Sequence, residues 1–389
     1  MALKTVEAAE GKAYEVVKSD HGAQSIILPD LRFSQTICNR AMYEDLMTDK
    51  NTKKQPFGVF RFLIRLFQIM LYIPIQIIFI PFAIIGILDG IYKGIGKSKK
   101  LGVSFTACRA LQYRWFMHYF NTRTDSLSVA FTKKFPCESH FGLWSTMGAL
   151  IISQRLFGFT TKLGKVPEPG EETLVSMVGR RLLMFDKIME KFVDEMEQIV
   201  IPGAGFDLIA LHFTKGKKVK VFELDQVKTL NIKVETLRKA GIEHDWITYI
   251  PVDYSNESWD DKLLEAGFDK TKKTLFLWQS VSLFLEDDII KETLRKMADL
   301  CVDGSIIAQD LYSKAYILGE ISKTVKRSSS LMGRMGEPWI FGIDMSDDPE
   351  AAVESFLGEC GLKMTEINKF GEKLDIEPFY CIVEAAKAA

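Results

Sequence analysis

Apolar and polar positions alternate in a regular rhythm over the second half of the chain. Short runs rich in β-branched and aromatic residues, typical of buried strands, are separated by amphipathic stretches with helical spacing. We expect strands at Gln198–Pro202, Lys218–Leu224, Trp246–Val252, Thr274–Gln279 and Gly304–Gln309, with helices between them, for example Gln226–Ala240 and Asp287–Leu300. This alternation predicts an α/β fold in which helices cover both faces of a mostly parallel sheet.

The rhythm changes after Tyr312. A helix near Pro349–Cys360 leads to two final strands, near Lys363–Phe370 and Pro378–Glu384. A closing pair of this kind predicts an antiparallel strand near the edge of the sheet.

The stretch Leu66–Leu88 differs from the rest because it carries no formal charge, and it is long enough to cross a bilayer. Basic residues stand on both sides: Arg61 and Arg65 before it, and Lys93, Lys97, Lys99 and Lys100 after it. Pro74 and Pro81 would kink a helix here. Three interpretations compete: a single kinked span, a re-entrant hairpin on the cytosolic face, and a buried core helix. The double basic flank favours the hairpin, and the length disfavours the core helix.

A second apolar patch, Phe141–Phe159, is too polar to span a membrane. It could lie in the membrane interface, line a substrate pocket or pack in a core. We therefore divide the chain into a polar segment (1–56), a membrane segment (57–100), a helical cap or substrate region (101–195) and a cofactor-binding domain (196–389).

Composition narrows the class of protein. The 389 residues are 47% hydrophobic and 26% charged, with a formal net charge of −1, which gives no indication of nucleic-acid binding. The 6 cysteines lack C-x-x-C spacing, so we expect neither a metal site nor a disulfide framework. A reducing compartment fits this pattern, and we expect a membrane-associated protein whose catalytic domain faces the cytoplasm.

Candidate chemistry gathers where the predicted strands end, which is where open α/β sheets bind ligands. The first strand runs into Gly203, Ala204, Gly205, Phe206 and Asp207, a turn that would let the backbone approach a ligand. Later strands end in polar residues: Glu223 and Asp225, then Asp253 and Tyr254, then Gln279. A carboxylate after the second strand can accept both ribose hydroxyls. Singly, each residue could serve only a turn or a helix cap. Together they predict a nucleotide-like cofactor.

The turn also restricts which cofactor fits. Leu208 stands where a dinucleotide fingerprint would have its third glycine, and no phosphate-binding loop for ATP is present. A cofactor without a pyrophosphate, such as S-adenosyl-L-methionine, is therefore favoured over NAD.

Five segments together resemble the leucine carboxyl methyltransferase family, especially its bacterial-type branch of small-molecule O-methyltransferases. They are Gly179–Asp186, Ile199–Asp207, Val221–Gln226, Phe276–Leu285 and Gly336–Ile343. The resemblance runs from about residue 178 to the end, and the helices between 104 and 177 could belong to it. It implies a class I methyltransferase fold, a Rossmann-like sheet of seven strands with one antiparallel strand near the C-terminus.

The same resemblance implies roles in binding S-adenosyl-L-methionine. Arg181 would meet its carboxylate and the Gly203–Gly205 turn its amino acid part. Asp225, with Glu223 near, would hold the ribose, and Asp253 and Tyr254 would flank the adenine. Two departures stand out: Leu208-Ile209 replaces the family's Thr-Arg, and Gln279-Ser280 replaces its Glu-Gly. Gln279 keeps a hydrogen-bond acceptor for the methionine end but lacks the charge.

Methyl transfer needs mainly proximity and alignment. A carboxylate acceptor needs no base, whereas a hydroxyl would need one, and His140, His212 and Tyr254 are candidates that nothing in the sequence separates. The membrane segment favours a small, lipophilic acceptor that enters from the bilayer. One alternative is a membrane-anchored methyltransferase-fold protein that acts as a binding or scaffold module without turnover. A nicotinamide-dependent oxidoreductase is the other. The sequence does not indicate an oligomeric state.

Overall fold

The computed structural model describes residues 5–7, 13–15, 57–161, 164–173, 176–254, 257–334, 336–373 and 378–388. Two units are distinguished, Met1–Ile64 and Arg65–Ala389. In the first, β1 (Thr5–Glu7) pairs antiparallel with β2 (Ala13–Glu15). The rest of the predicted polar segment 1–56 lies outside the described residues. The boundaries proposed at residues 100 and 195 stay predictions.

A seven-stranded sheet forms the centre of the second unit, in the order β5-β4-β3-β6-β7-β9-β8. Its strands are β3 (Gln198–Pro202), β4 (Lys220–Asp225), β5 (Ile247–Pro251), β6 (Thr274–Trp278), β7 (Ile306–Tyr312), β8 (Leu362–Phe370) and β9 (Tyr380–Lys387). The first five pair in parallel, and β9 runs antiparallel between β7 and β8. The predicted class I methyltransferase sheet is confirmed. The strand predicted at Gly304–Gln309 begins later and runs on to Tyr312, because Gly304 has a φ of 83° and sits in the preceding turn.

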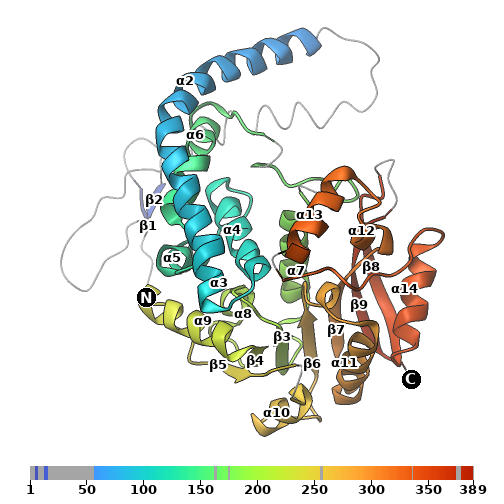
Figure 1. The fold of residues 1–389 in the computed structure, drawn as a ribbon. Helices are drawn as coiled ribbons and strands as arrows, with labels where there is room; N and C mark the ends of the chain where they lie inside the picture. Colours follow the sequence, from blue (N-terminus) through green and yellow to red (C-terminus); the bar gives the residue numbers. More distant parts are fainter. Residues whose placement is uncertain are drawn as a thin grey trace. The chain divides into compact units, whose positions relative to one another are not determined.

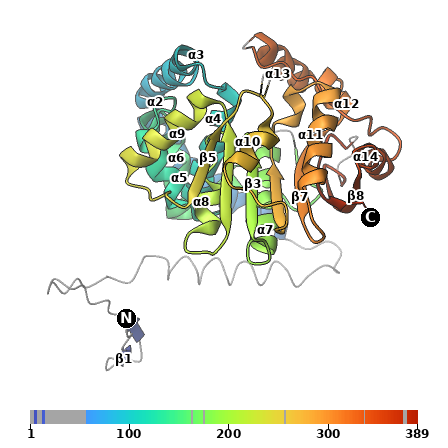
Figure 2. The same cartoon turned by 90° about the horizontal axis from the view of Figure 1, so that it is seen from below.

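Helices cover both faces of the sheet, as Figure 2 shows. On one face lie α7 (Met177–Phe192), α8 (Ile209–Thr214) and α9 (Val227–Ala240), and on the other lie α10 (Trp259–Glu265), α11 (Asp287–Leu300) and α14 (Pro349–Gly358). Neighbouring strand residues separate between these two cores: Ile199 and Ile201 belong to the first, and Val200 belongs to the second. A strand buried on both faces accounts for the continuous apolar runs in the sequence.

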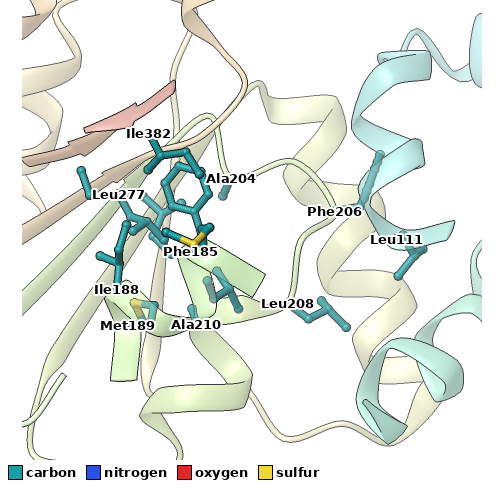
Figure 3. Close-up of a cluster of buried hydrophobic side chains, with 14 of the residues drawn as sticks. Leu111, Phe185, Ile188, Met189, Ala204, Phe206, Leu208, Ala210, Leu277 and Ile382 are labelled. Atoms are coloured by element: carbon teal, nitrogen blue, oxygen red, sulfur yellow. The ribbon is translucent and has the colours of Figure 1, made fainter. Parts of the chain in front are cut away.

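The first core extends beyond the sheet (Figure 3). Phe185 of α7 packs among side chains of the strands, including Leu277 and Ile382. Phe206 and Leu208 leave the sheet and point toward Leu111 of a neighbouring helix. Phe206 and Leu208 thus anchor the glycine turn in the same core that holds Leu111 of this helix.

Three helices precede the sheet: α4 (Phe105–Tyr119), α5 (Ser126–Lys134) and α6 (His140–Phe157). Each has a polar N-cap whose side chain accepts a backbone N–H of the first turn: Ser104, Asp125 and Ser139. The predicted patch Phe141–Phe159 is α6 with its C-terminal extension. Its residues Leu143, Leu150 and Ile151 pack in a core with Trp115 of α4, so core packing is confirmed for this side of the patch.

The predicted membrane segment lies within α2 (Phe57–Ile91), which continues through the short π-helix η1 (Tyr92–Lys97) into α3 (Ser98–Leu101) (Figure 1). The prediction of a re-entrant hairpin is wrong, because the helix does not turn back and contains both Pro74 and Pro81. The buried-core interpretation is also wrong, since only 6% of the most apolar window is buried. In the described part of the chain, Phe60–Leu101 is the helix long and apolar enough to cross a membrane.

The remaining described helices connect and flank the last strands. They are η3 (Ser282–Phe284), α12 (Lys314–Leu318) and α13 (Lys323–Arg334).

Candidate functional site

The glycine turn after β3 has a backbone that requires glycine at two positions. Gly203 has a φ of 70° and Gly205 a φ of 51°, in the left-handed region that side chains disfavour. A Cβ atom on Gly203 would also overlap Val281 after β6. The amide of Gly203 donates to the carbonyl of Leu224 (2.8 Å) and to the hydroxyl of Tyr254 (3.1 Å). The turn is therefore fixed by the hydrogen bonds of its amides and by the close approach of Val281.

Asp225 at the end of β4 closes the other side of this turn. Its Oδ2 accepts the amide of Gly205 (2.7 Å), and its Oδ1 accepts the amide of Gln226 (2.7 Å). Burial raises the pKa of Asp225, although these two amides act in the opposite direction. The side chain of Thr229 also donates to this carboxylate, and because a carboxylate has about four acceptor positions, about one remains for a ribose hydroxyl.

Glu223 lies two residues earlier on β4 and faces the interior instead. Its Oε2 is 2.6 Å from Nζ of Lys233 on α9, and both side chains are almost completely buried. The same Nζ donates to the carbonyl oxygen of Asp207 (2.7 Å). Burial raises the pKa of Glu223, and Lys233 opposes this shift. Lys233 thus ties β4 to the glycine turn, and of the two acids predicted for the ribose, Asp225 is the one at the turn.

Asp207 is held by a fully buried arginine, Arg114 of α4. The Arg114 Nε lies 2.8 Å from Asp207 Oδ1, and its Nη2 donates to Oδ2 at 3.1 Å. Its Nη1 donates to Asp186 of α7 at 3.2 Å. Burial opposes ionisation of Asp207, but Arg114 lowers its pKa overall. Asp207 Oδ1 also accepts the amide of Ile209 (3.0 Å), so this acid caps the start of α8.

Arg181 of α7 lies in a different environment from Arg114. It is 8% exposed, and its Nη1 donates to the hydroxyl of Tyr312 at the end of β7 (3.2 Å). Its Nε has no hydrogen-bond partner, and Arg181 forms no salt bridge with any residue that the structure describes. The Asp310 carboxylate acts on Arg181 electrostatically, but no carboxylate of the described residues contacts the guanidinium directly, so a ligand anion could still bind it.

Ser280, which replaces the family glycine after β6, is held in an unusual conformation. Its φ is 57°, a value that is rare for residues other than glycine. Its amide donates to Asp310 Oδ1 (2.7 Å), and its hydroxyl donates to Asp310 Oδ2 (3.1 Å). Tyr380 also donates to Oδ2 (2.9 Å). Burial raises the pKa of Asp310, and Arg181 nearby acts in the opposite direction. Asp310 therefore stabilises the turn that a glycine would adopt without strain.

The other predicted site residues lie around the same edge. The Asp253 amide donates to Glu257 (2.8 Å), and the buried hydroxyl of Tyr254 braces the glycine turn. Burial raises the pKa of Tyr254, so it stays a phenol. Gln279 directly follows β6, and Ala204 follows Gly203. Within the described ranges, no cluster of three or more His, Cys, Asp or Glu residues is placed to hold a metal ion.

A pocket lies between α4 and the start of α7, next to Arg181 in sequence. Aromatic side chains and cations line it, among them Tyr113, Phe116, Phe120, Lys165 and Arg180. It combines apolar walls with positive charge, but its volume of about 30 Å³ has room for about one water molecule, so an organic anion would have to widen it.

The sequence did not predict the roles of Arg114, Lys233 and Asp310 at the site. It also did not predict the left-handed conformation of Ser280. Asp310 could have been predicted as a site residue, because it is an acid near the end of a predicted strand, one residue past the predicted boundary. Arg114 could not, since its partners Asp186 and Asp207 lie 72 and 93 residues away and only the fold brings them together. Lys233 lies ten residues after Glu223, on the helix that follows β4, and the sequence does not show that its side chain points inward.

Comparison with known proteins adds to this geometry. Residues 152–298 match the leucine carboxyl methyltransferase family. The predicted resemblance is therefore confirmed, with a match that begins within α6 and ends within α11.

Two relatives of this chain are named as S-adenosyl-L-methionine-dependent methyltransferases. A predicted S-adenosyl-L-methionine-dependent methyltransferase of Mycobacteroides abscessus is 28% identical over 195 residues, 49% of this chain and 64% of that protein. A second, from Frankia alni, is 26% identical over 180 residues, 46% of this chain and 59% of that protein. This chain thus spans about three fifths of the length of these relatives.

Solved structures with similar folds include a DUF574 family protein from Streptomyces avermitilis, at 15% identity and a TM-score of 0.41 over 54% of this chain and 83% of that one. Magnesium protoporphyrin IX methyltransferase from Synechocystis, solved with bound S-adenosylhomocysteine, gives 11% identity and a TM-score of 0.37 over 57% and 90%. The fold assignment itself rests on the strand order.

The buried ion pair yields a stability prediction. We expect Lys233→Met to lower the free energy of unfolding by about 3 kcal/mol, because it leaves Glu223 charged or forces it to protonate in the core. Adding Glu223→Gln should recover part of the loss. Urea unfolding followed by tryptophan fluorescence measures both. Lys239→Met on the same helix is the control, since Lys239 is exposed and pairs with Glu235 at the surface. A Lys233→Met protein as stable as this control would refute the role of the pair.

Ser280 yields a second prediction. Ser280→Gly should stay within about 1 kcal/mol of the wild type, because relief of the left-handed backbone offsets the lost hydrogen bond to Asp310. Ser280→Val should cost more than about 2 kcal/mol, since a β-branched residue is strained at this φ and makes no such bond. Urea midpoints compare the two variants, and equal stabilities would contradict the strain.

Proposed function

We propose that this protein is an S-adenosyl-L-methionine-dependent methyltransferase. The observation that carries the proposal is Arg181, a buried cation whose Nε has no hydrogen-bond partner and which no carboxylate of the described residues contacts directly, at the same sheet edge as the glycine turn. Contacts join the two: Gly203 faces Val281, the adjacent Ser280 binds Asp310 on β7, and β7 ends at Tyr312, which contacts Arg181. The chain therefore offers a positive group and a backbone turn to one ligand.

The residues present fit this cofactor at each end. Arg181 would bind its carboxylate, and the Gly203–Gly205 turn would accommodate its amino acid part. Asp225 would hold the ribose, and Asp253 and Tyr254 would flank the adenine. Gln279 would accept a hydrogen bond from the ammonium group. When bound, the sulfonium supplies an electrophilic methyl group, so the protein's task is alignment and exclusion of water.

A carboxylate is the acceptor group that this site suits best, because it needs no general base. The Nδ1 of His140 already accepts a hydrogen bond from Trp115 (3.2 Å), and burial lowers the pKa of His140. Burial also lowers the pKa of His212, which lies on α8 behind the turn. Tyr254 is a buried phenol engaged with Gly203. His140 and Tyr254 are thus engaged in hydrogen bonds, whereas His212 is exposed on α8.

The pocket beside α7 would receive this acceptor. Its Lys165 would attract a carboxylate, and its aromatic residues would bind an apolar body. Phe120 lines this pocket and also belongs to the core that Tyr72 of α2 packs against. A lipophilic acid would thus reach the site from the side of the membrane helix.

Cofactor binding tests the first part of the proposal. Calorimetry with S-adenosylhomocysteine on the full chain in detergent should show binding, and Arg181→Met should weaken it by about 10- to 100-fold through loss of a charge-assisted contact. Arg180→Met is the matched control, since that guanidinium already faces Glu172 at 3.4 Å. No binding of the donor or its product at millimolar concentration would refute the function and favour a scaffold role. Unchanged binding in Arg181→Met would refute only the role of Arg181.

The acceptor group can be tested with matched compounds. Aromatic and long-chain carboxylic acids are compared with the corresponding alcohols, using a methyl-labelled donor. We expect label on the acids, as esters that release methanol on treatment with alkali. Alkali-stable ethers on the alcohols alone would contradict a carboxylate acceptor.

A further inference from the structure

The two sides of α2 have different surroundings. The less exposed positions recur every three or four residues, the spacing of one helix face: Gln68, Tyr72, Gln76, Phe79, Ala83, Gly86 and Asp89. All of the polar side chains between Leu66 and Asp89 lie on this inner face. The outer face consists of large apolar side chains such as Ile78 and Leu88, which are 65% and 63% exposed. An exposed apolar face of this length marks an interaction surface.

The inner face contacts α6 along its whole length, and the two helices run antiparallel. Gln68 Nε2 donates to the carbonyl of Phe157 (2.9 Å) near one end, and Ser139 donates to Asp89 at the other. Between them the backbones approach closely, because a Cβ on Gly142 would lie only 2.6 Å from the carbonyl oxygen of Gly86. The part of α2 from Gln68 to Asp89 is therefore packed against α6 within the second unit.

This docking conflicts with a membrane crossing. From Gln68 to Asp89 the helix is about 30 Å long, the thickness of the hydrocarbon core, and α6 accompanies nearly all of it. On its other side α6 packs against α4. The ring of Trp144 on α6 stands edge-on to that of Trp115 on α4, with 5.6 Å between the ring centroids. The residue before Trp115 is Arg114, which binds the glycine turn. A crossing α2 would draw α6, α4 and this ion cluster into hydrocarbon, at a large cost.

We propose that α2 lies in the plane of a membrane as a monotopic anchor. Its outer face is immersed in one leaflet, and the sheet domain stays in water on the same side. The partner is an anionic leaflet, because cations stand at both ends of the apolar stretch: Arg61, Arg65, Lys93, Lys97, Lys99 and Lys100. An in-plane helix places both ends among the headgroups of one leaflet, which accounts for the symmetric basic flanks.

Helix α6 extends the same surface. Its Leu156 and Phe141 are 71% and 48% exposed, and they lie near the opposite ends of the contact with α2. A surface formed by two adjacent helices is wider than one helix face. It suits a bilayer, which accepts a broad apolar area without matching its shape.

Labelling from one side of sealed vesicles distinguishes an in-plane helix from a crossing one. The full chain is reconstituted with Cys38→Ser, since Cys108, Cys137, Cys301, Cys360 and Cys381 are buried. A single reporter is then placed before or after the helix, as Arg61→Cys or Lys99→Cys. A membrane-impermeant maleimide is added to the outside of the vesicles. For protein bound to the outer leaflet, it should label the cysteine in each of the two variants. Labelling of one flank with protection of the other would show a crossing helix and overturn the proposal.

Flotation with vesicles tests the partner. The chain should bind phosphatidylcholine vesicles more tightly when phosphatidylserine is added, and Lys99→Gln and Lys100→Gln should each weaken that gain about fivefold. Ile78→Glu with Ile85→Glu should reduce binding by about tenfold or more. Ile289→Glu is the control, because Ile289 is exposed on α11, away from α2.

Other occupants of the outer face give different results. If the face covers a second copy of the chain, the double variant will convert a dimer to a monomer and leave vesicle binding unchanged. That result, or no flotation by the wild type, would overturn the proposal. Binding that is equal with and without phosphatidylserine would refute the anionic partner.

Discussion

The buried guanidinium of Arg114 is the contact on which the arrangement of the site depends. It binds Asp207 in the glycine turn and Asp186 on α7, and it comes from α4 in the helical region before the sheet. Three separate parts of the chain are thus joined by one side chain. In a low-dielectric interior, such a cluster is stabilising only when every charge keeps its partner, so the turn and both helices must hold one relative position.

A continuous set of contacts leads from the surface helix to this cluster. The inner face of α2 docks on α6, α6 packs through Trp144 against Trp115 of α4, and Arg114 adjoins Trp115. The apolar surface and the proposed cofactor turn therefore belong to one packed body. A membrane bound to α2 would be held at a fixed place relative to the pocket beside α7.

The sheet was predictable from the sequence, because the short apolar runs of its strands and the 3.6-residue pattern of its helices are local. The first strand and α11 begin and end at the predicted residues. The state of α2 was less predictable, since length and apolarity are the same for a span, a hairpin and an in-plane helix. Its docking depends on close backbone contact at Gly86 and Gly142, which are far apart in sequence. For the same reason the turn residues could be named in advance, whereas the long-range partner Arg114 could not.

The two departures from the family pattern acquire a physical meaning from these contacts. Leu208 and Ile209, in place of Thr-Arg, are both 2% exposed and fill the core beside Leu111 (Figure 3). Asp207 is paired with Arg114 of α4. Ser280, in place of glycine, keeps the glycine-like backbone through its two hydrogen bonds to Asp310. Both replacements thus preserve the geometry of the turns around the proposed cofactor site. A chain that had lost turnover would have no need to keep that geometry, so these compensations favour an active enzyme over a scaffold.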